Sequence, residues 1–363
     1  MAYYATKDYF EDPDAITAAQ ELAEGKLRLE WFDVATERVK AIAADPRRGL
    51  TYDDCNLGRY GYDALPEYVR HNYSMAARGC VLVPGLPDLG YTVNRKSDVW
   101  SDNVPALYEE SKTRRWVPAV DIDWEALRAL ALAPAAQAAM CQLCTALEEI
   151  ALVMMEFPSR WVAVINQEFL ELKSYQCAQM IDEARHIEVF RKRAMTTGGL
   201  KRASASIEQA LKELLMAETY PEGSLGLNVM VGSLLLGIYG QAGAVSAPDA
   251  KLFRLCGQDT AREVAYGMGH MRYHLAQQPA RREFLQDYLD RTEHTFAGIV
   301  GSQEILEPLI VLAGGGIEPA QVVAGRRAIA TLLQRTVGQY LARCAAIGLE
   351  RRDRTRLATF FSA

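Results

Sequence analysis

Apolar positions recur at helical spacing along most of this chain, so the sequence predicts an almost entirely helical protein. No alternating pattern of six or more residues indicates a strand. We predict long helices at 124–157, 159–195, 222–246 and 248–277, shorter ones near 204–218, 280–297 and 302–313, and a last amphipathic helix at 319–347. Four long helices with short connections favour a helical bundle.

Proline and glycine mark the expected ends of these helices, because proline lacks a backbone donor and glycine readily leaves the helical conformation. We expect breaks at Phe157-Pro158, Thr197-Gly198-Gly199, Tyr220-Pro221 and Ala247-Pro248.

The N-terminal third has a different pattern. Residues 14–45 predict a helix that Asp14 can cap. From Pro46 to Pro105, frequent prolines, glycines and tyrosines predict irregular structure with short helical pieces. We therefore expect an N-terminal region at 1–120 that wraps a core built elsewhere, and a helical bundle with C-terminal helices at 121–363.

One stretch is long enough to cross a membrane, since no charged residue lies between Gly223 and Pro248. It contains Asn228, Gln241 and many glycines and lacks basic flanks, so we interpret it as a helix buried inside the bundle. Acidic residues occupy the N-terminus where a secretory signal would be apolar, and the odd count of seven cysteines argues against a disulfide framework. We expect a cytoplasmic protein without a membrane partner.

The charge balance of the chain excludes one class of function, nucleic-acid binding. The chain has 40 Lys and Arg against 46 Asp and Glu, a net charge of -6, with both signs scattered evenly. Nucleic-acid-binding proteins concentrate positive charge instead. We therefore expect no nucleic-acid partner.

The sharpest chemical feature is the run from Asp182 to His186 inside the second long helix. Glu183 and His186 are three residues apart, so they share one helix face and can reach one metal ion. Apolar residues surround the run on both sides, and a buried carboxylate is costly without a partner. This spacing is the ligand motif of di-iron carboxylate bundles.

The preceding helix offers further carboxylates. Glu149 and Glu156 are seven residues apart and share one face, and Glu149 precedes Glu183 by 34 residues. That length is enough to run along one helix, turn and return to the same level. Glu148 is the alternative ligand, and a further interpretation makes all of these glutamates exposed residues of an amphipathic helix.

A faint internal repeat points to a second half-site. Asp259-Thr260-Ala261-Arg262-Glu263 follows the first run by 77 residues and keeps its Asp-x-Ala-Arg frame. Both ligand positions are changed, to Thr260 and Glu263. The helix before it offers Glu222.

Residues 140–277 resemble the ferritin-like di-iron oxygenase superfamily, most closely the hydroxylase subunits of bacterial multicomponent monooxygenases and ferritin-like N-oxygenases. The resemblance implies an all-α, ferritin-like four-helix bundle with additional helices, two irons and O₂ as co-substrate. By this resemblance Glu149, Glu183 and His186 hold the first iron, with Glu183 bridging. Glu222 is the third carboxylate, and Thr260 and Glu263 occupy the second Glu-x-x-His.

That second motif departs from the family pattern. A neutral hydroxyl at Thr260 is a poor ligand, whereas Glu263 can still bind iron through oxygen. In the family, the Asp before each Glu hydrogen-bonds the His of the opposite repeat, so Asp259 would orient His186 and Asp182 would face Glu263. Facing carboxylates repel unless one is protonated or a cation intervenes. Either Glu263 coordinates metal or the second site has decayed.

His270 is a further ligand candidate. It lies two turns beyond Glu263, about 10 Å along the helix axis, so it reaches the same metal only if the helix distorts. A π-bulge would do this, and Gly267 and Gly269 favour one.

We expect an oxygen-activating, iron-dependent oxidase or monooxygenase, with two irons or with one. Its substrate would be a small organic or carrier-bound molecule of secondary metabolism. Electrons would come from a separate reductase, since no flavin or nicotinamide motif is present, and a homodimer is expected. No catalytic residue beyond the metal ligands is assigned.

Three other functions are consistent with the same residues. One is a non-catalytic partner subunit that has lost half of its ligands. Another is a di-metal enzyme whose opened site changes the outcome to N-oxygenation or halogenation. The third, a metal-storage protein, is disfavoured by the long N-terminal region.

Overall fold

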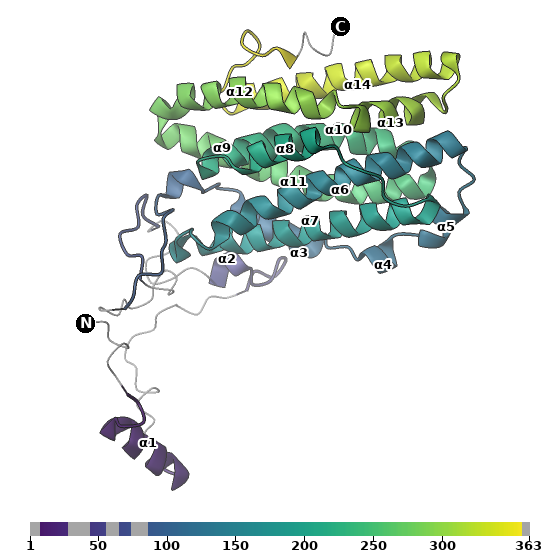
Figure 1. Cartoon of the computed structure of the whole chain (residues 1–363). Coiled ribbons are helices and arrows are strands. Elements are labelled where there is room, and N and C mark those ends of the chain that lie inside the picture. Colours follow the sequence, from purple (N-terminus) through teal and green to yellow (C-terminus); the bar gives the residue numbers. More distant parts are fainter. Residues whose placement is uncertain (1–7, 28–43, 56–64, 74–85, 358–363) are drawn as a thin grey trace. The chain divides into compact units, whose positions relative to one another are not determined.

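The computed structural model describes residues 8–27, 44–55, 65–73 and 86–357. Contacts divide the chain into two compact units, one of residues 1–96 with 164–171 and one of residues 97–163 with 172–363. Residues 97–120, which the sequence analysis assigned to the N-terminal region, therefore belong to the unit that contains the bundle (Figure 1).

The smaller unit has little regular structure where it is described. It contains α1 (Pro13–Ala23), α2 (Tyr52–Cys55) and the short helix η3 (Gln167–Phe169). Asp12 caps α1, two residues before the cap predicted at Asp14, because Pro13 suits the first helical position. The remainder of the helix predicted at 14–45 lies largely outside the described residues. The irregular structure predicted from Pro46 to Pro105 is confirmed in its described parts.

The described residues of the larger unit form helices and their connections, and the short helix η2 (Lys96–Asp98) contains its first two residues. Helix α10 packs along α11, α13 packs on α6 and α14, and α12 packs on α8. Figure 1 shows these helices stacked in layers, with α12, α13 and α14 on one side and α6 and α7 on the other. The bounds are α3 (Val104–Thr113), α4 (Pro118–Asp121), α5 (Trp124–Ala129), α6 (Pro134–Val162), α7 (Leu170–Thr197), α8 (Ala205–Leu215), α9 (Tyr220–Gly223), η4 (Ser224–Val231), α10 (Gly232–Gly243), α11 (Ala247–Gln277), η5 (Pro279–Arg281), α12 (Arg282–Val300), α13 (Gln303–Gly314) and α14 (Pro319–Ala346).

Three predicted boundaries are wrong, and one of them is the start of the helix predicted at 159–195, which begins only at Leu170. The helix predicted at 124–157 is two helices, since α5 ends before Pro134 and α6 begins there. The break predicted at Phe157-Pro158 is absent, and α6 continues to Val162. Phe157 stacks on Tyr220 with ring centroids 5.2 Å apart, so packing of this turn outweighs the hydrogen bond that Pro158 cannot donate.

The third long helix contains a segment of different geometry. Between α9 and α10, η4 is a π-helix over Ser224–Val231. Every residue of η4 is buried. By contrast, α11 is regular through Gly267 and Gly269, so the π-bulge predicted there is wrong. Because π-helical turns are rare and occur mostly at functional sites, the position of η4 beside α11 bears on the site below.

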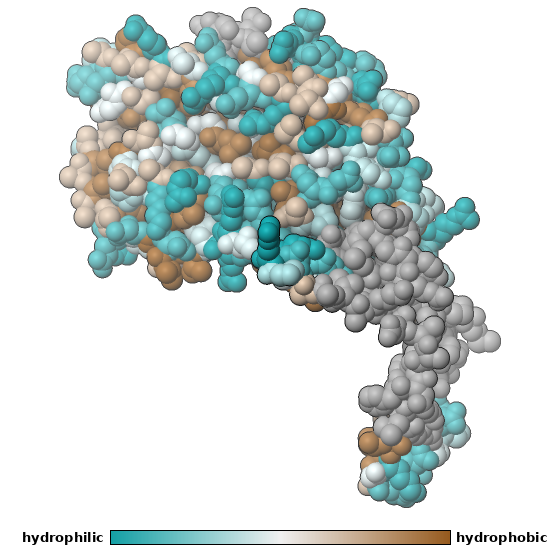
Figure 2. Space-filling view, turned by 180° about the vertical axis from the view of Figure 1, so that it is seen from behind, coloured by the Kyte–Doolittle hydropathy of each residue, from teal (hydrophilic) through white to brown (hydrophobic). Residues whose placement is uncertain are grey.

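The uncharged stretch that begins at Gly223 is buried, as predicted. The segments Pro134–Val162 and Tyr220–Gly243 are each long and apolar enough to cross a membrane, as is the bent helix pair at 279–314 if taken as one span. In the most apolar window of Tyr220–Gly243, 83% of the residues are buried inside the protein. Figure 2 shows hydrophilic residues interspersed with hydrophobic ones on the visible face. Packing inside the bundle therefore accounts for the apolar character of this segment.

Candidate metal centre

Helices α7 and α11 bring the two sequence motifs together in the core. Glu183 and His186 lie on α7, and Thr260 and Glu263 lie on α11; all four are at most 1% exposed. His186 Nδ1 is 3.2 Å from Glu183 Oε1. The Glu263 carboxyl lies close enough to Glu183 for the two charges to interact. The two copies of the sequence repeat, on α7 and α11, therefore lie next to each other in the core.

The polar atoms of this centre have no hydrogen-bond partners. Both carboxylate oxygens of Glu183 and of Glu263, both ring nitrogens of His186, and the Thr260 hydroxyl are buried and unsatisfied. Buried polar groups are nearly always hydrogen-bonded, because leaving one without a partner costs free energy. A concentration of such atoms in one place indicates a site that a ligand completes.

The two carboxyls perturb one another. Burial, and then the negative charge of Glu183, raise the pKa of Glu263 well above its usual range. For His186, burial lowers the pKa, but the adjacent Glu183 carboxylate outweighs it and the pKa is raised well above the usual value. The centre therefore favours added positive charge, either as protons or as a bound cation.

A layer of buried ion pairs lies directly behind this centre. Arg262 donates to Asp182 and Asp259, with Nη2–O distances of 2.6 Å to each. Arg185 donates to the same two aspartates. Trp116 Nε1 donates to Asp259 Oδ2 at 2.7 Å. Two arginines thus balance two aspartates, and the layer has no net charge.

This layer shows which groups the two aspartates contact. His186 Nε2 lies 3.5 Å from Asp259 Oδ2, so Asp259 is on the side of the ring predicted for an orienting residue. Asp182 binds Arg262, so the cation needed beside this carboxylate is a guanidinium. Glu263 is left with its own oxygens unsatisfied and free to accept a cation.

Glu149 is not part of the centre. It is partly buried among Glu148, Glu208 and Arg191, and burial, followed by the first two charges, raises its pKa. Arg191 pairs with the alternative ligand, Glu148. The structure corrects the assignment of both glutamates, because the face of α6 that carries them packs toward α8 and Arg191.

Glu156, the other carboxylate of that predicted face, is exposed. It accepts a hydrogen bond from Ser159 on the same helix. The interpretation of an exposed glutamate on an amphipathic helix therefore holds for Glu156.

Glu222 is also turned away from the centre. Its carboxylate accepts hydrogen bonds from the backbone N–H and the hydroxyl of Thr219, each at 2.9 Å. These contacts form a capping box at the start of α9. The predicted metal ligand is instead a helix cap, and the prediction is corrected because Glu222 lies at position N3, where a cap needs a carboxylate.

His270 belongs to a separate aromatic cluster. Its Nδ1 is 3.1 Å from the Ser224 hydroxyl, and its ring packs against Tyr220 and Tyr266. Since α11 has no π-bulge, the two-turn separation from Glu263 is kept. The assignment of His270 as a ligand is therefore corrected as well.

The remaining side chains are of donor types that bind metal ions. Carboxylate oxygen and imidazole nitrogen suit iron and manganese. The 3.2 Å between Glu183 and His186 is close to the edge of about 3 Å expected when two bonds of about 2.1 Å meet at a right angle. In the described ranges, no three His, Cys, Asp or Glu side chains are already arranged around a metal position. Two-metal sites of this fold take a Glu from each of two helices and a Glu-x-x-His from each of the others.

Sequence reasoning missed the arginines of this site. Arg185 and Arg262 hold the two aspartates in place, and Trp116 adds a bond from the segment before α4. The signal for the arginines was present, because both copies of the Asp-x-Ala-Arg frame keep the arginine while the ligand positions change. Trp116 had no such signal, since it comes from 143 residues away in the chain.

Aromatic side chains cover the centre. The His186 ring lies 6.1 Å from Phe190 and 6.4 Å from Tyr239, and Phe253 stacks on Phe190. All three aromatic residues are at most 3% exposed. They keep water away from the unsatisfied oxygens.

Comparison with known proteins identifies the fold. No family model and no curated protein matches the chain. Among solved structures, an R2-like ligand-binding oxidase with an aerobically reconstituted metal cofactor after photoconversion is 18% identical, with a TM-score of 0.52 over 68% of this chain and 94% of that one. The chain has the ferritin-like fold.

Two variants of the same oxidase agree. A valine-to-isoleucine variant with an aerobically reconstituted Mn/Fe cofactor has a TM-score of 0.50 at 18% identity. A tyrosine-to-phenylalanine variant with such a cofactor has a TM-score of 0.52 at 19% identity. Both cover 68% of this chain and 94% of theirs. The predicted all-α, ferritin-like architecture is confirmed.

Proposed function

We propose that this chain is a metal-dependent oxidase that uses O₂, with Glu183, His186 and Glu263 as the metal-holding residues. The observation that carries the proposal is the meeting of two fully buried carboxylates and an imidazole, none with a hydrogen-bond partner. Keeping such groups buried is costly unless a cation completes them. A bound iron or manganese ion would relay to O₂ the electrons that a separate reductase supplies.

The protein residues prepare this centre. Asp259 lies on the Nε2 side of His186, which leaves Nδ1 facing Glu183. Arg185 and Arg262 fix Asp259 in that position. The aromatic cover excludes water, which would otherwise weaken the electrostatic interactions inside the site. The protein thus holds the His186 ring in one orientation before any metal enters.

Iron and manganese are both to be tested. The names of the similar structures report Mn/Fe cofactors for those proteins. For this chain we propose a small organic or carrier-bound substrate, with monooxygenation as one outcome and N-oxygenation or halogenation as others. A separate reductase would supply electrons, and the enzyme would work in the cytoplasm.

A second candidate is a non-catalytic partner subunit. The specific observation in its favour is that Glu149 and Glu222 are used elsewhere, so two helices of the bundle contribute no carboxylate to the centre. Under this alternative, Glu183 and Glu263 would share a proton instead of a metal ion.

Metal loading separates the two candidates. We expect one ion per chain after anaerobic loading with Fe(II) or Mn(II), measured by elemental analysis, and O₂ consumption by the loaded protein. Glu183→Ala and His186→Ala should lose both the ion and O₂ consumption, whereas Glu156→Ala, an exposed carboxylate on α6, should keep them. Two ions per chain would contradict the site of three residues proposed here. No bound ion in a folded chain would favour the partner subunit, and unchanged activity in both site variants would refute the assignment.

A further inference from the structure

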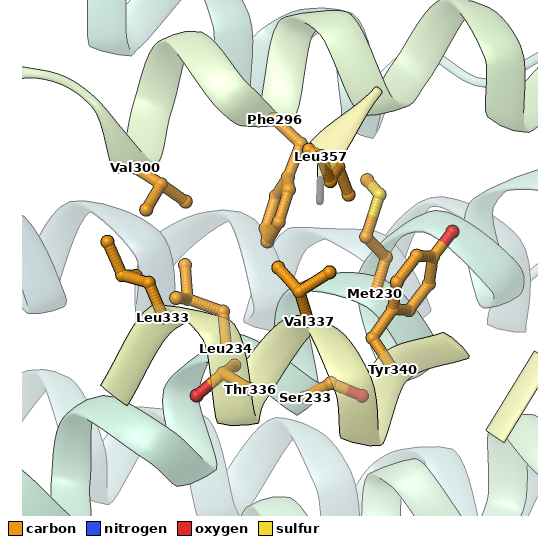
Figure 3. Close-up of a pocket in the computed structure, with 10 residues that line it drawn as sticks. All are labelled: Met230, Ser233, Leu234, Phe296, Val300, Leu333, Thr336, Val337, Tyr340 and Leu357. Atoms are coloured by element: carbon orange, nitrogen blue, oxygen red, sulfur yellow. The ribbon is translucent and has the colours of Figure 1, made fainter. Parts of the chain in front are cut away.

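The space enclosed by η4, α10, α12 and α14 is filled by side chains. Its volume is about 10 Å³, roughly the least that one water molecule needs. Figure 3 shows Val337 and Leu357 among the apolar side chains that converge on it. This space therefore has no room for a ligand.

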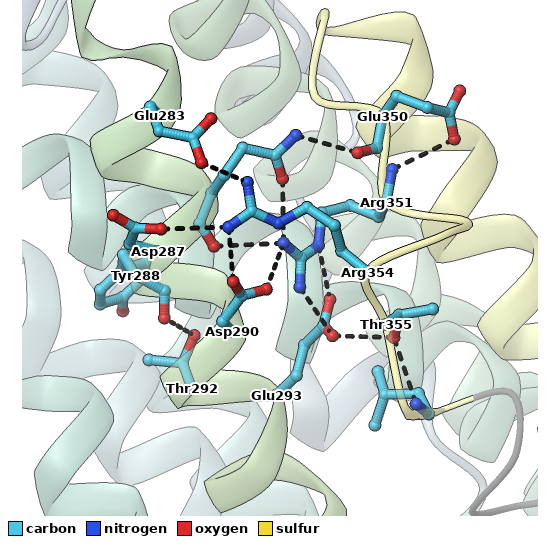
Figure 4. A network of polar contacts seen from close by, with 12 residues as sticks. Glu283, Asp287, Tyr288, Asp290, Thr292, Glu293, Glu350, Arg351, Arg354 and Thr355 are labelled. Atoms are coloured by element: carbon cyan, nitrogen blue, oxygen red, sulfur yellow. Dashed lines mark hydrogen bonds and ion pairs between the residues drawn. The ribbon is translucent and has the colours of Figure 1, made fainter.

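The arginines that follow α14 already have partners. Arg354 bonds three acidic side chains of α12 at 2.6, 3.0 and 2.6 Å, which are Glu283, Asp287 and Asp290 (Figure 4). The buried Arg351 has one nitrogen 2.8 Å from Asp290 and another 2.9 Å from Glu293. Acidic groups of the protein itself thus neutralise both arginines, and this network does not call for an added anion.

A groove between α3 and α11 differs in both respects. Its volume is about 360 Å³, within the range of small-molecule sites. The side chains that line it include Leu107, Glu110 and Arg114 from the α3 side and Arg254, Ala261 and Arg262 from α11. Three of these side chains carry a positive charge and one carries a negative charge. The groove therefore has both room and an excess of positive charge.

Hydrogen bonds at both ends of α3 fix this helix on α11. Asn103, which precedes α3, donates through Nδ2 to the Ala265 carbonyl at 3.0 Å. At the other end, Gln258 Nε2 donates to the carbonyl of Arg114, which follows α3, at 3.1 Å. The two walls of the groove are therefore held in place by the protein alone.

Two arginines of the groove have donors to spare. Arg254 is exposed, and its side chain has no partner among the described residues. Arg262 is the most deeply buried of the lining residues named above, at 2% exposed. Its Nη2 is shared by the two aspartates of the buried layer, whereas its Nε and Nη1 have no hydrogen-bond partner. By contrast, Arg114 is paired with Glu110 at 3.3 Å.

We propose that this groove binds a small organic molecule that carries an oxyanion, either a phosphate or a carboxylate group. Guanidinium groups match both oxyanions through their forked N–H donors. The oxyanion would accept hydrogen bonds from Arg262, and the charge of Arg254 would attract it from the rim. Buried donors without a partner cost free energy, which a bound oxyanion would relieve. Leu107 and Ala261 would contact the organic part.

Arg262 also connects the groove to the buried layer of ion pairs. It donates to Asp259, which lies on the Nε2 side of His186. A ligand bonded to Arg262 would therefore share its guanidinium with the aspartate that orients this histidine. The binding site itself does not depend on the proposed oxidase function, because none of the proposed metal-holding residues lines the groove.

Isothermal titration calorimetry of the full chain at low salt tests the site, with phenyl phosphate as the probe. We expect saturable binding of phenyl phosphate and none of phenol, which lacks the oxyanion. Benzoate in a second titration separates a phosphate site from a carboxylate site. Arg262→Lys keeps a cation beside the aspartates but removes the forked donors, so it should weaken binding about tenfold. Arg254→Ala removes one surface charge and should weaken it about two- to fivefold.

Two more variants separate the groove from general charge attraction. Ala261→Leu fills the groove at an exposed helix position without changing charge, and it should abolish binding. Glu110→Gln releases Arg114 and should tighten binding about two- to fivefold. The matched control is Arg326→Ala, an exposed arginine of α14, which should bind like the unsubstituted chain. A cooperative melt checks that every variant is folded.

Three results would overturn the proposal. The first is no saturable binding of either phenyl phosphate or benzoate, and the second is equal binding of phenol. The third is unchanged affinity in folded Ala261→Leu and Arg262→Lys. Each leaves the outcome of metal loading untouched, so failure of this site and failure of the oxidase proposal can be told apart.

Discussion

The Glu263 carboxyl is buried opposite Glu183, at the position that His186 occupies in the first copy of the repeated motif. An imidazole there would be neutral or positive beside Glu183, whereas a carboxyl adds a second negative charge. Burial and that charge raise the Glu263 pKa well above its usual value. Without a cation the folded chain holds a proton on this pair that the unfolded chain releases near pH 4.5. The proton is therefore linked to stability.

Glu263→Gln should stabilise the metal-free protein, and the gain should grow with pH. Between pH 4.5 and the raised pKa, the folded chain binds more protons than the unfolded chain, so its free energy of unfolding falls as pH rises. Glutamine does not ionise, so the variant avoids this loss, by about 1–3 kcal/mol at the upper end of the window. Thermal melts in chelator from pH 5 to 8 measure this gain in stability, with Glu156→Gln as the exposed control. Parallel pH profiles for the two variants would contradict the protonated pair.

At the scale of the elements, the contact between η4 and α11 sets the shape of the site. A Cβ added at Gly267 of α11 would be 2.9 Å from Asn228 Cβ and 2.9 Å from Val229 Cγ2, both on the π-helix. Real contacts of this kind are longer, so the absence of a side chain at Gly267 lets the two helices approach. Helix α11 is an α-helix throughout this contact, and His270 stays two turns from Glu263.

Gly267→Ala should destabilise the protein by about 1–3 kcal/mol, because the added methyl group overpacks this contact. Gly240→Ala is the matched control: it lies on an exposed part of α10 with nothing within 4 Å of the new Cβ. There alanine should stabilise the helix by about 0.5–1 kcal/mol. Chemical unfolding of both variants measures the difference. Equal effects of the two substitutions would mean that the close approach at Gly267 does not limit packing.

At the scale of the whole bundle, a buried ion pair joins the end of α7 to the start of α11. Arg193 Nε donates to Asp249 Oδ1 at 2.6 Å, and both side chains are fully buried. Asp249 also accepts from Ser246, which caps α11. This contact and the Asp–Arg layer near Asp182 fix α7 against α11 at two levels, so that the motif residues meet.

Arg193→Met should cost about 3–5 kcal/mol, because it leaves the Asp249 carboxylate buried without its cation. Its neighbour Lys192 forms a surface pair with Glu188 and lies over the Trp124 ring, and the Lys192 side chain is 44% exposed. Lys192→Met should change the free energy of unfolding by about 0–1 kcal/mol. Denaturant titrations of the two variants compare these effects. A small loss in Arg193→Met would show that the pair does not hold the two helices together.

The sequence by itself determined the helical class, most helix positions, and the pair Glu183 and His186. Spacing of three residues places two side chains on one face whatever surrounds the helix, and the repeated Asp-x-Ala-Arg frame located the partner helix. Only the tertiary structure decided the roles of Glu149, Glu222 and His270. Sequence spacing allows each of the three to be a ligand. In the structure, however, the rotation of α6 turns Glu149 toward Glu208, and Glu222 caps α9 together with Thr219. His270 packs beside the π-helix at Ser224–Val231. Periodicity defines the faces of a helix, whereas packing of its neighbours decides which face meets the centre.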